Sequence, residues 1–187
     1  MKMLKKLLAV VLTGAMALTL LTACGSNAVN DKNIADAMTD LAKTQSSNAT
    51  FIPRAKEREL ARNFAALAES KAADGKNIFD DDDGETFAEE RKNILGCNQG
   101  NADNFVWAAG IPTDKFGNSA QAFGLLYQTV DGESAQNYDD LKNKNMEPAD
   151  ERYMGTALCK IPDDDGNLVT VRIIVVTAKA EVDKDKA

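Results

Sequence analysis

Acidic residues are the first candidates for chemistry in this chain. A run of four aspartates ends one residue before Gly84. A calcium-binding EF-hand loop has oxygen ligands at positions 1, 3 and 5, glycine at position 6 and glutamate at position 12. With Gly84 at position 6, Asp81, Asp83 and Glu90 fall on ligand positions, but Phe79 occupies position 1. A solvated loop is therefore the preferred interpretation, and weak calcium binding by Asp81, Asp83 and Glu90 is the alternative.

The absence of histidine from the whole chain excludes several chemistries. Ser-His-Asp catalysis, Cys-His catalysis and histidine metal sites all require it, and histidine is the commonest general base. Asp and Glu number 29 against 22 Lys and Arg, which gives a net charge of -7. A negative surface disfavours nucleic acid, which is bound through clusters of Lys and Arg. No glycine-rich phosphate loop is present, and no cofactor is expected.

Cys24 follows a segment with the features of an export signal. Three lysines lie within the first six residues, and residues 7–21 are almost entirely apolar. A basic start, a short apolar core and small residues at the cleavage site are typical of a secretory signal. The apolar stretch is shorter than the ~20 residues of a membrane-spanning helix. The order Leu21-Thr22-Ala23-Cys24 resembles the bacterial lipobox, which implies cleavage before Cys24 and acylation of its sulfur.

The lipobox resemblance predicts the organisation of the chain. Residues 1–23 are the lipoprotein signal peptide, residues 24–32 a polar tether, residues 33–178 a single domain and residues 179–187 a charged tail. Two or three acyl chains on Cys24 would hold the protein on the extracytoplasmic face of the cell membrane, because a single chain anchors only marginally. An uncleaved anchor, or an ordinary signal with a chance cysteine, is the alternative.

Cys97 and Cys159 are the cysteines that remain after Cys24. Two cysteines in an exported protein form a candidate disulfide. The alternative is a pair of buried thiols, because a free cysteine packs as a small hydrophobic residue.

Hydrophobic periodicity predicts helices in the first part of the chain and a β-hairpin at its end. A β-branched run at residues 168–176 is apolar on both faces, as in a strand covered by helices on both sides. The predicted fold class is therefore α+β, an α-β-α sandwich with a small antiparallel sheet flanked by helices. The expected elements are helices at 33–45, 54–73, 87–94, 119–130 and 134–143, a strand at 104–109, and a hairpin at 153–161 and 168–176.

This order of elements resembles the CAP superfamily of cysteine-rich secretory proteins, antigen 5 and pathogenesis-related proteins. The resemblance extends from about Ile34 to Val176. The motifs that carry it are Glu59-Leu60-Ala61, Asp83-Gly84-Glu85-Thr86-Phe87, Glu90-Arg91, Gly96-Cys97, Asp103-Asn104-Phe105-Val106 and Met154-Gly155-Thr156-Ala157.

The resemblance implies a cleft in which two histidines and two acidic residues hold a divalent metal. Both histidine positions, near Phe79–Asp82 and near Glu133–Asn137, are occupied by other residues, so the metal site is absent. Asp103 aligns with one acidic position. Asp103, Asn104 and Tyr127 are the candidate cleft residues.

The expected function is that of a non-enzymatic binding or interaction module of the cell envelope, with a histidine-free CAP-like cleft and an unidentified ligand or envelope protein as partner. One alternative is a carboxylate-dependent hydrolase of cell-wall or protein substrates. Two carboxylates about 5–9.5 Å apart across a concave site would favour it. Another alternative is a structural or immune-facing lipoprotein without a specific ligand.

Overall fold

The computed structural model describes residues 30–76, 78–79, 87–97, 103–113, 116–142, 144–163 and 165–183. Residues from Asp31 onward belong to one compact unit. No helix in the described ranges is both long enough and apolar enough to cross a membrane. The predicted signal peptide, Cys24 and two of the calcium candidates, Asp81 and Asp83, lie outside the described residues.

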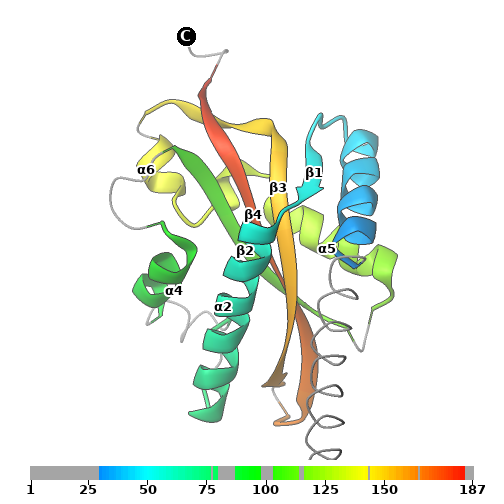
Figure 1. Cartoon of the computed structure of the whole chain (residues 1–187), viewed down its shortest axis with the longest axis vertical. Coiled ribbons are helices and arrows are strands. Elements are labelled where there is room, and N and C mark those ends of the chain that lie inside the picture. Colours follow the sequence, from blue (N-terminus) through cyan, green and yellow to red (C-terminus); the bar gives the residue numbers. More distant parts are fainter. Residues whose placement is uncertain are drawn as a thin grey trace, which may run out of the picture. The chain divides into compact units, whose positions relative to one another are not determined.

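Four strands form one sheet in the order β1-β3-β4-β2 (Figure 1). The long strands β3 (Met146–Pro162) and β4 (Leu168–Val182) form the predicted antiparallel hairpin. Strand β2 (Asn104–Pro112) lies antiparallel beside β4, and the short β1 (Thr50–Pro53) lies parallel beside β3. The sheet is therefore mixed, and only β1 departs from the antiparallel arrangement that was predicted.

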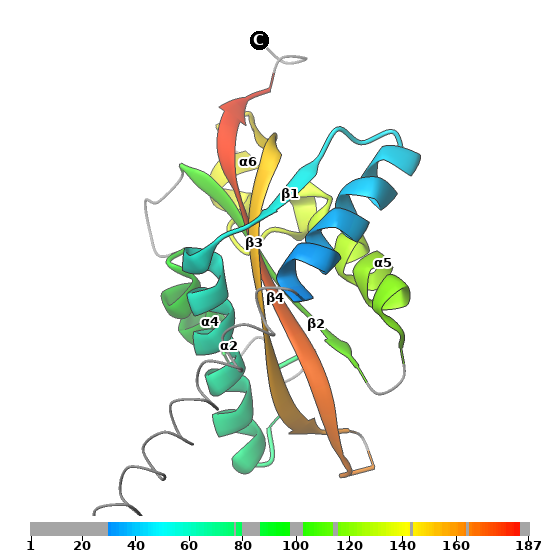
Figure 2. The same ribbon diagram turned by 45° about the vertical axis from the view of Figure 1, so that its right-hand side comes forward.

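Helices cover both faces of this sheet, which confirms the predicted α-β-α sandwich (Figure 2). Helical residues 30–44 and α5 (Asn118–Thr129) pack on one face; α2 (Ala55–Ala73) and α4 (Ala88–Leu95) pack on the other. The 3-10 turn η1 (Gly132–Ser134) and the short helix α6 (Tyr138–Lys142) connect α5 to β3.

Strand β4 separates two hydrophobic cores by the alternation of its side chains. Ile174, Val176, Ala178 and Ala180 belong to the α5-side core, which also contains Trp107. The intervening residues Val171, Ile173 and Val175 belong to the α2-side core. Burial on both faces is what the uninterrupted apolar run of this strand predicted.

Gly155 of β3 is the position where α2 comes closest to the sheet. A Cβ atom at Gly155 would lie 2.5 Å from the carbonyl carbon of Glu57 and closer still to the backbone nitrogen of Arg58. The alanines on the sheet-facing stripe of α2 permit the same close approach along the helix. The buried members of that stripe are Ala61, Phe64, Ala65 and Ala68.

Strand β1 was not predicted, and its shortness explains why. Its four residues lie between the helices predicted at 33–45 and 54–73, where no element was predicted. Phe51 is buried in the α5-side core while Ile52 is exposed. The four residues Thr-Phe-Ile-Pro also lack apolar and polar alternation and end in proline, so nothing in the sequence indicated a strand.

Both predicted ends of the domain were wrong. Strand β4 continues to Val182, four residues into the predicted tail, because Lys179 pairs with Asn104 and Ala180 is buried. The helix at 30–44 begins inside the predicted tether 24–32. Asp31 in its first turn is fully buried, so the folded domain begins at least two residues earlier than expected.

Gly155→Ala should destabilise the protein strongly. The added methyl group meets helix backbone, which cannot rotate away as a side chain can. Overpacking of a well-packed core costs about 1–3 kcal/mol, and we expect the upper end, about 3 kcal/mol in the free energy of unfolding. Urea denaturation measures this. The control is Gly132→Ala, whose Cβ would meet its neighbours no closer than 3.6 Å. Equal stability of the two variants would contradict the close approach of α2.

Candidate functional site

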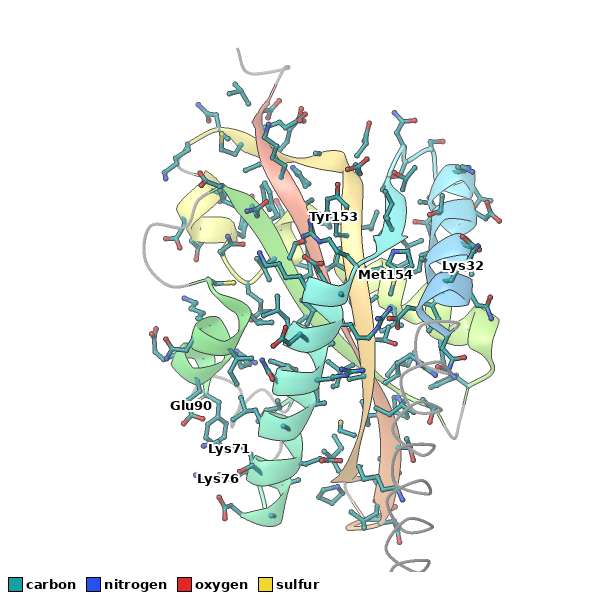
Figure 3. All side chains as sticks on the ribbon, in the orientation of Figure 1. Lys32, Lys71, Lys76, Glu90, Tyr153 and Met154 are labelled. Atoms are coloured by element: carbon teal, nitrogen blue, oxygen red, sulfur yellow. The ribbon has the colours of Figure 1, made fainter. Side chains whose placement is uncertain are left out.

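A buried carboxylate marks the start of α2 on the α2 side of the sheet. Glu57 is fully buried and forms a two-point ion pair with Arg54. Thr177 of β4 donates its hydroxyl hydrogen to the same carboxylate at 2.7 Å. The Arg54 guanidinium also stacks on Tyr153, 3.8 Å from the ring centroid, and Figure 3 shows Tyr153 on β3 beside the start of α2.

The hydrogen bonds around Glu57 determine its charge state. Burial by itself would raise the pKa of this carboxyl group. The bonds donated by Arg54 and Thr177, together with the Arg54 charge, outweigh burial and lower the pKa below its ordinary value. Glu57 is therefore an ionised carboxylate saturated with donors. It cannot serve as a general acid, and its role is to fix the start of α2 against β4.

A pocket of about 140 Å³ opens next to this ion pair. Its apolar lining consists of Leu60 from α2, Ile94 and Leu95 from α4, and Val106 from β2. Its polar lining consists of Arg54, Lys56, Gly96, Asn104 and Thr177. Lys56 is exposed and forms no ion pair with any residue that the structure describes. We call this the α2–α4 pocket: its lining is mixed, with four apolar side chains and two basic ones, Arg54 and Lys56.

A second, more polar pocket of about 240 Å³ lies along the segment between α5 and α6. It contains the stretch Glu133–Asn137, where the CAP resemblance places a histidine. Asn137 holds this segment against β2, because its amide donates to the carbonyl of Asn104 at 2.7 Å and accepts from the Val106 nitrogen at 3.2 Å. The acids that line the pocket, Glu133, Asp139 and Asp140, are all solvent-exposed.

The three candidate cleft residues do not come together. Asn104 lines the α2–α4 pocket. Asp103 is exposed in the turn before β2, where its carbonyl accepts the amide hydrogen of Ala180. Tyr127 lies on α5, which covers the opposite face of the sheet, and it is 74% exposed. The predicted cleft of Asp103, Asn104 and Tyr127 was therefore wrong, because the sheet separates the α5 side from the pocket.

Glu90, the one calcium candidate within the described residues, has a different partner. It pairs with Lys71 of α2 at 2.9 Å, and Lys71 in turn lies over the ring of Phe87. Figure 3 shows Glu90, Lys71 and Lys76 close together near the C-terminal end of α2. Within the described ranges, no group of three or more His, Cys, Asp or Glu side chains is placed to hold a metal ion.

Cys97 and Cys159 are free, buried thiols, so the alternative to the predicted disulfide is what the structure contains. Both belong to the α2-side core, but Cys97 follows α4, with Lys92 and Asp140 nearby, whereas Cys159 lies on β3 near Glu69. Burial raises the pKa of Cys97 to about 11 and that of Cys159 to about 12. Because the thiolate is the reactive form, neither cysteine is suited to nucleophilic catalysis.

A second buried carboxylate, that of Asp31, was not predicted from the sequence. Its Oδ1 atom accepts hydrogen bonds from the backbone nitrogen of Thr156 at 3.1 Å and from the Thr156 hydroxyl at 2.5 Å. Its Oδ2 atom accepts from Arg58 Nε at 2.6 Å. An acidic residue just before the periodic apolar residues of helix 30–44 is a helix-start signal, and it was available in the sequence.

Glu57→Gln should weaken the fold most at neutral pH. The pKa of Glu57 in the folded state lies below its unfolded value of about 4.3. The ionised carboxylate therefore stabilises the fold above that pH, and this contribution disappears as the pH falls through the folded-state pKa. We expect the free energy of unfolding to drop by about 1–3 kcal/mol at pH 7, and the gap from the unmodified protein to shrink on acidification.

Urea denaturation between neutral and acidic pH measures that gap. Glu59→Gln, an exposed position on the same helix, is the matched control and should change stability little at any pH. A gap that does not depend on pH, or one of equal size in the control, would contradict the assigned role of Glu57.

Comparison of the chain with protein-family models, with curated proteins and with solved structures gives no significant match.

Proposed function

We propose that this chain is a lipid-anchored extracytoplasmic lipoprotein that acts as a non-enzymatic binding module of the cell envelope. The binding role is inferred from the α2–α4 pocket, which combines apolar side chains with two basic ones in a chain of net charge -7. The anchor is inferred from the lipobox resemblance around Cys24. The histidine-free CAP-like assignment of the domain is part of the same proposal, supported by the order of elements and the α-β-α arrangement.

The chemistry of the described side chains supports binding over catalysis. Glu57 and Asp31 are saturated with hydrogen-bond donors, and both buried cysteines have raised pKa values. Nucleophilic catalysis requires an activated nucleophile next to a base, and histidine, the usual base, is absent from the chain. The charged groups of the sandwich are used to hold its layers together.

The size and lining of the pocket indicate a class of ligand. At about 140 Å³ the pocket is smaller than the ~300–1,000 Å³ typical of sites for drug-sized molecules. It suits a short apolar chain, or the tip of a larger molecule. Arg54 is already paired with Glu57, whereas the Lys56 ammonium has no ion-pair partner among the described residues. We therefore propose a short-chain carboxylate, with its apolar part against Leu60 and Val106 and its charge near Lys56.

A carboxylate-dependent hydrolase is the second candidate function, and the polar pocket is where it would operate. Glu133, Asp139 and Asp140 all line that pocket. In such enzymes, however, one carboxyl group acts as a general acid because a low-dielectric environment raises its pKa. The three acids here are exposed. Their exposure makes binding the preferred function.

Cys24→Ala should abolish membrane attachment. In a bacterial host, the unmodified full chain is expected in the membrane fraction, labelled by radioactive palmitate and released by detergent but not by high salt. The variant should lack the label, because no other residue accepts the lipid. Cys97→Ala, at a buried thiol, is the control and should keep both label and membrane location. Label retained in Cys24→Ala would overturn the anchor.

Hexanoate should stabilise the chain through the α2–α4 pocket. At a ligand concentration ten times the dissociation constant, binding adds about 1.4 kcal/mol, which raises the melting temperature by roughly 3–6 °C. The uncharged analogue hexanamide should have a smaller effect. Thermal denaturation of the lipidated chain in detergent measures both.

Lys56→Glu should remove the effect of hexanoate, because it places a negative charge at the edge of the pocket. Lys144→Glu makes the same change in net charge at an exposed position that does not line the pocket, and should leave the shift intact. Equal shifts in the two variants would show that hexanoate acts elsewhere, and no shift in the unmodified chain would rule out this ligand class.

A further inference from the structure

An exposed aromatic stripe runs along α5. Phe116 is 44%, Phe123 49% and Tyr127 74% exposed. Ala120, also exposed, Phe123 and Tyr127 are spaced three and four apart, which places them on one face of α5, and Phe116 lies two residues before the helix begins. We call this set the α5 stripe. Scattered exposed hydrophobic residues are normal on a protein surface, but a row of aromatic side chains along one helix face marks an interaction site.

The charge of α5 distinguishes this stripe from the rest of the surface. The helix contains no Asp, Glu, Lys or Arg in its twelve residues, in a chain of which 27% is charged. Moving a charged side chain out of water costs much free energy, and α5 has no charged side chain. Its surface can therefore enter a non-aqueous environment at low free-energy cost. The amphipathic ring of tyrosine is also suited to the boundary between membrane and water.

The start of the folded domain adjoins the stripe. Asp31 accepts a hydrogen bond from Thr156, Thr156 accepts one from Arg172, and Arg172 donates another to Gln121 of α5. Gln121 in turn donates to the carbonyl of Phe116, the first residue of the stripe. Two side chains, Thr156 and Arg172, therefore connect Asp31 to Gln121 of α5. Helix 30–44 and α5 also lie side by side in both ribbon views (Figures 1 and 2).

The short distance along the chain from Cys24 to Asp31 limits how the domain can be placed. Seven residues reach about 25 Å at most when fully extended. A domain of this length is roughly 40 Å across, from the scaling of domain size with chain length. A lipid on Cys24 therefore holds the side of the domain that carries Asp31 against the bilayer. The neighbouring α5 stripe lies on that side. It is exposed, apolar and free of charged residues.

We propose that the α5 stripe lies on the lipid bilayer and fixes the orientation of the anchored domain. This inference rests on the proposed lipid anchor at Cys24. Phe116, Phe123 and Tyr127 enter the boundary between headgroups and acyl chains, while α2 and α4, on the opposite face of the sheet, point away from the membrane. The α2–α4 pocket then opens away from the bilayer, where a water-borne ligand can reach it.

Tryptophan fluorescence in brominated lipid tests this orientation. The lipidated full chain carrying Phe123→Trp is reconstituted in phosphatidylcholine vesicles whose acyl chains are brominated close to the headgroup. We expect a blue shift and a loss of fluorescence from the introduced tryptophan. The native Trp107 is fully buried and supplies a constant background. Phe79→Trp is the matched control, because Phe79 is also a partly exposed aromatic residue but contacts Phe64 on the α2 side.

The outcomes separate this inference from the anchor itself. Quenching in Phe123→Trp but not in Phe79→Trp supports the bilayer contact. A chain that stays with the vesicles but shows no quenching overturns the contact and leaves the anchor intact. A blue shift without quenching indicates that the tryptophan is buried against protein, in this chain or a second copy of it, and also overturns the contact. A chain that leaves the vesicles overturns both proposals. Tyr127→Trp, at a more exposed position, gives a second reporter if the first variant does not fold.

Discussion

Strand β1 is too short to pair with the whole outer edge of β3, and the Asp31 carboxylate binds part of the edge that it leaves open. The sandwich depends on this carboxylate. Strand β1 pairs with β3 only as far as Met154. Beyond that point, side chains satisfy the outer edge of β3: the Thr156 nitrogen donates to Asp31, and the Lys160 nitrogen donates to Glu69. An unpaired strand edge invites pairing with other chains, and carboxylates placed along it protect against this. The same Asp31 side chain binds Arg58, so helix 30–44 and α2 are joined around the edge of the sheet.

Other buried charged side chains, like Asp31, hold the helices on the sheet. With α2 held by Arg58, its first turn lies directly on Gly155, and Glu57 meets Thr177 of β4. On the opposite face, Arg152 donates to the carbonyls of Thr129 and Val130, the end of α5, where a cation is favoured by the helix dipole. Burial lowers the pKa of Arg152 to about 10, far enough above neutrality for it to remain charged. Buried charges thus fix both helix layers on the sheet.

The parts of this fold that the sequence predicted are those with a local signal. The β-branched run of β4 and the hydrophobic periodicity of α2 both act through neighbours a few residues away. Asp31 and Thr156 are 125 residues apart, and Glu57 and Thr177 are 120 residues apart. No local pattern encodes such pairs. For the same reason Lys56 was not found: its pocket is lined by residues of α2, α4, β2 and β4, four elements that meet only in the fold.

The position of Asp31 also ties the fold to the proposed anchor. A frayed first helical turn would lengthen the tether, but it would remove the Asp31 carboxylate from Thr156 and Arg58. Arg58 is mostly buried and Thr156 fully so, so both would lose their partner inside the protein. Leaving buried donors unsatisfied is costly, about 1–3 kcal/mol for each group. The helix therefore resists unwinding from its N-terminal end. With the proposed lipid on Cys24, the reach of the tether is therefore set by the position of Asp31, seven residues further along the chain.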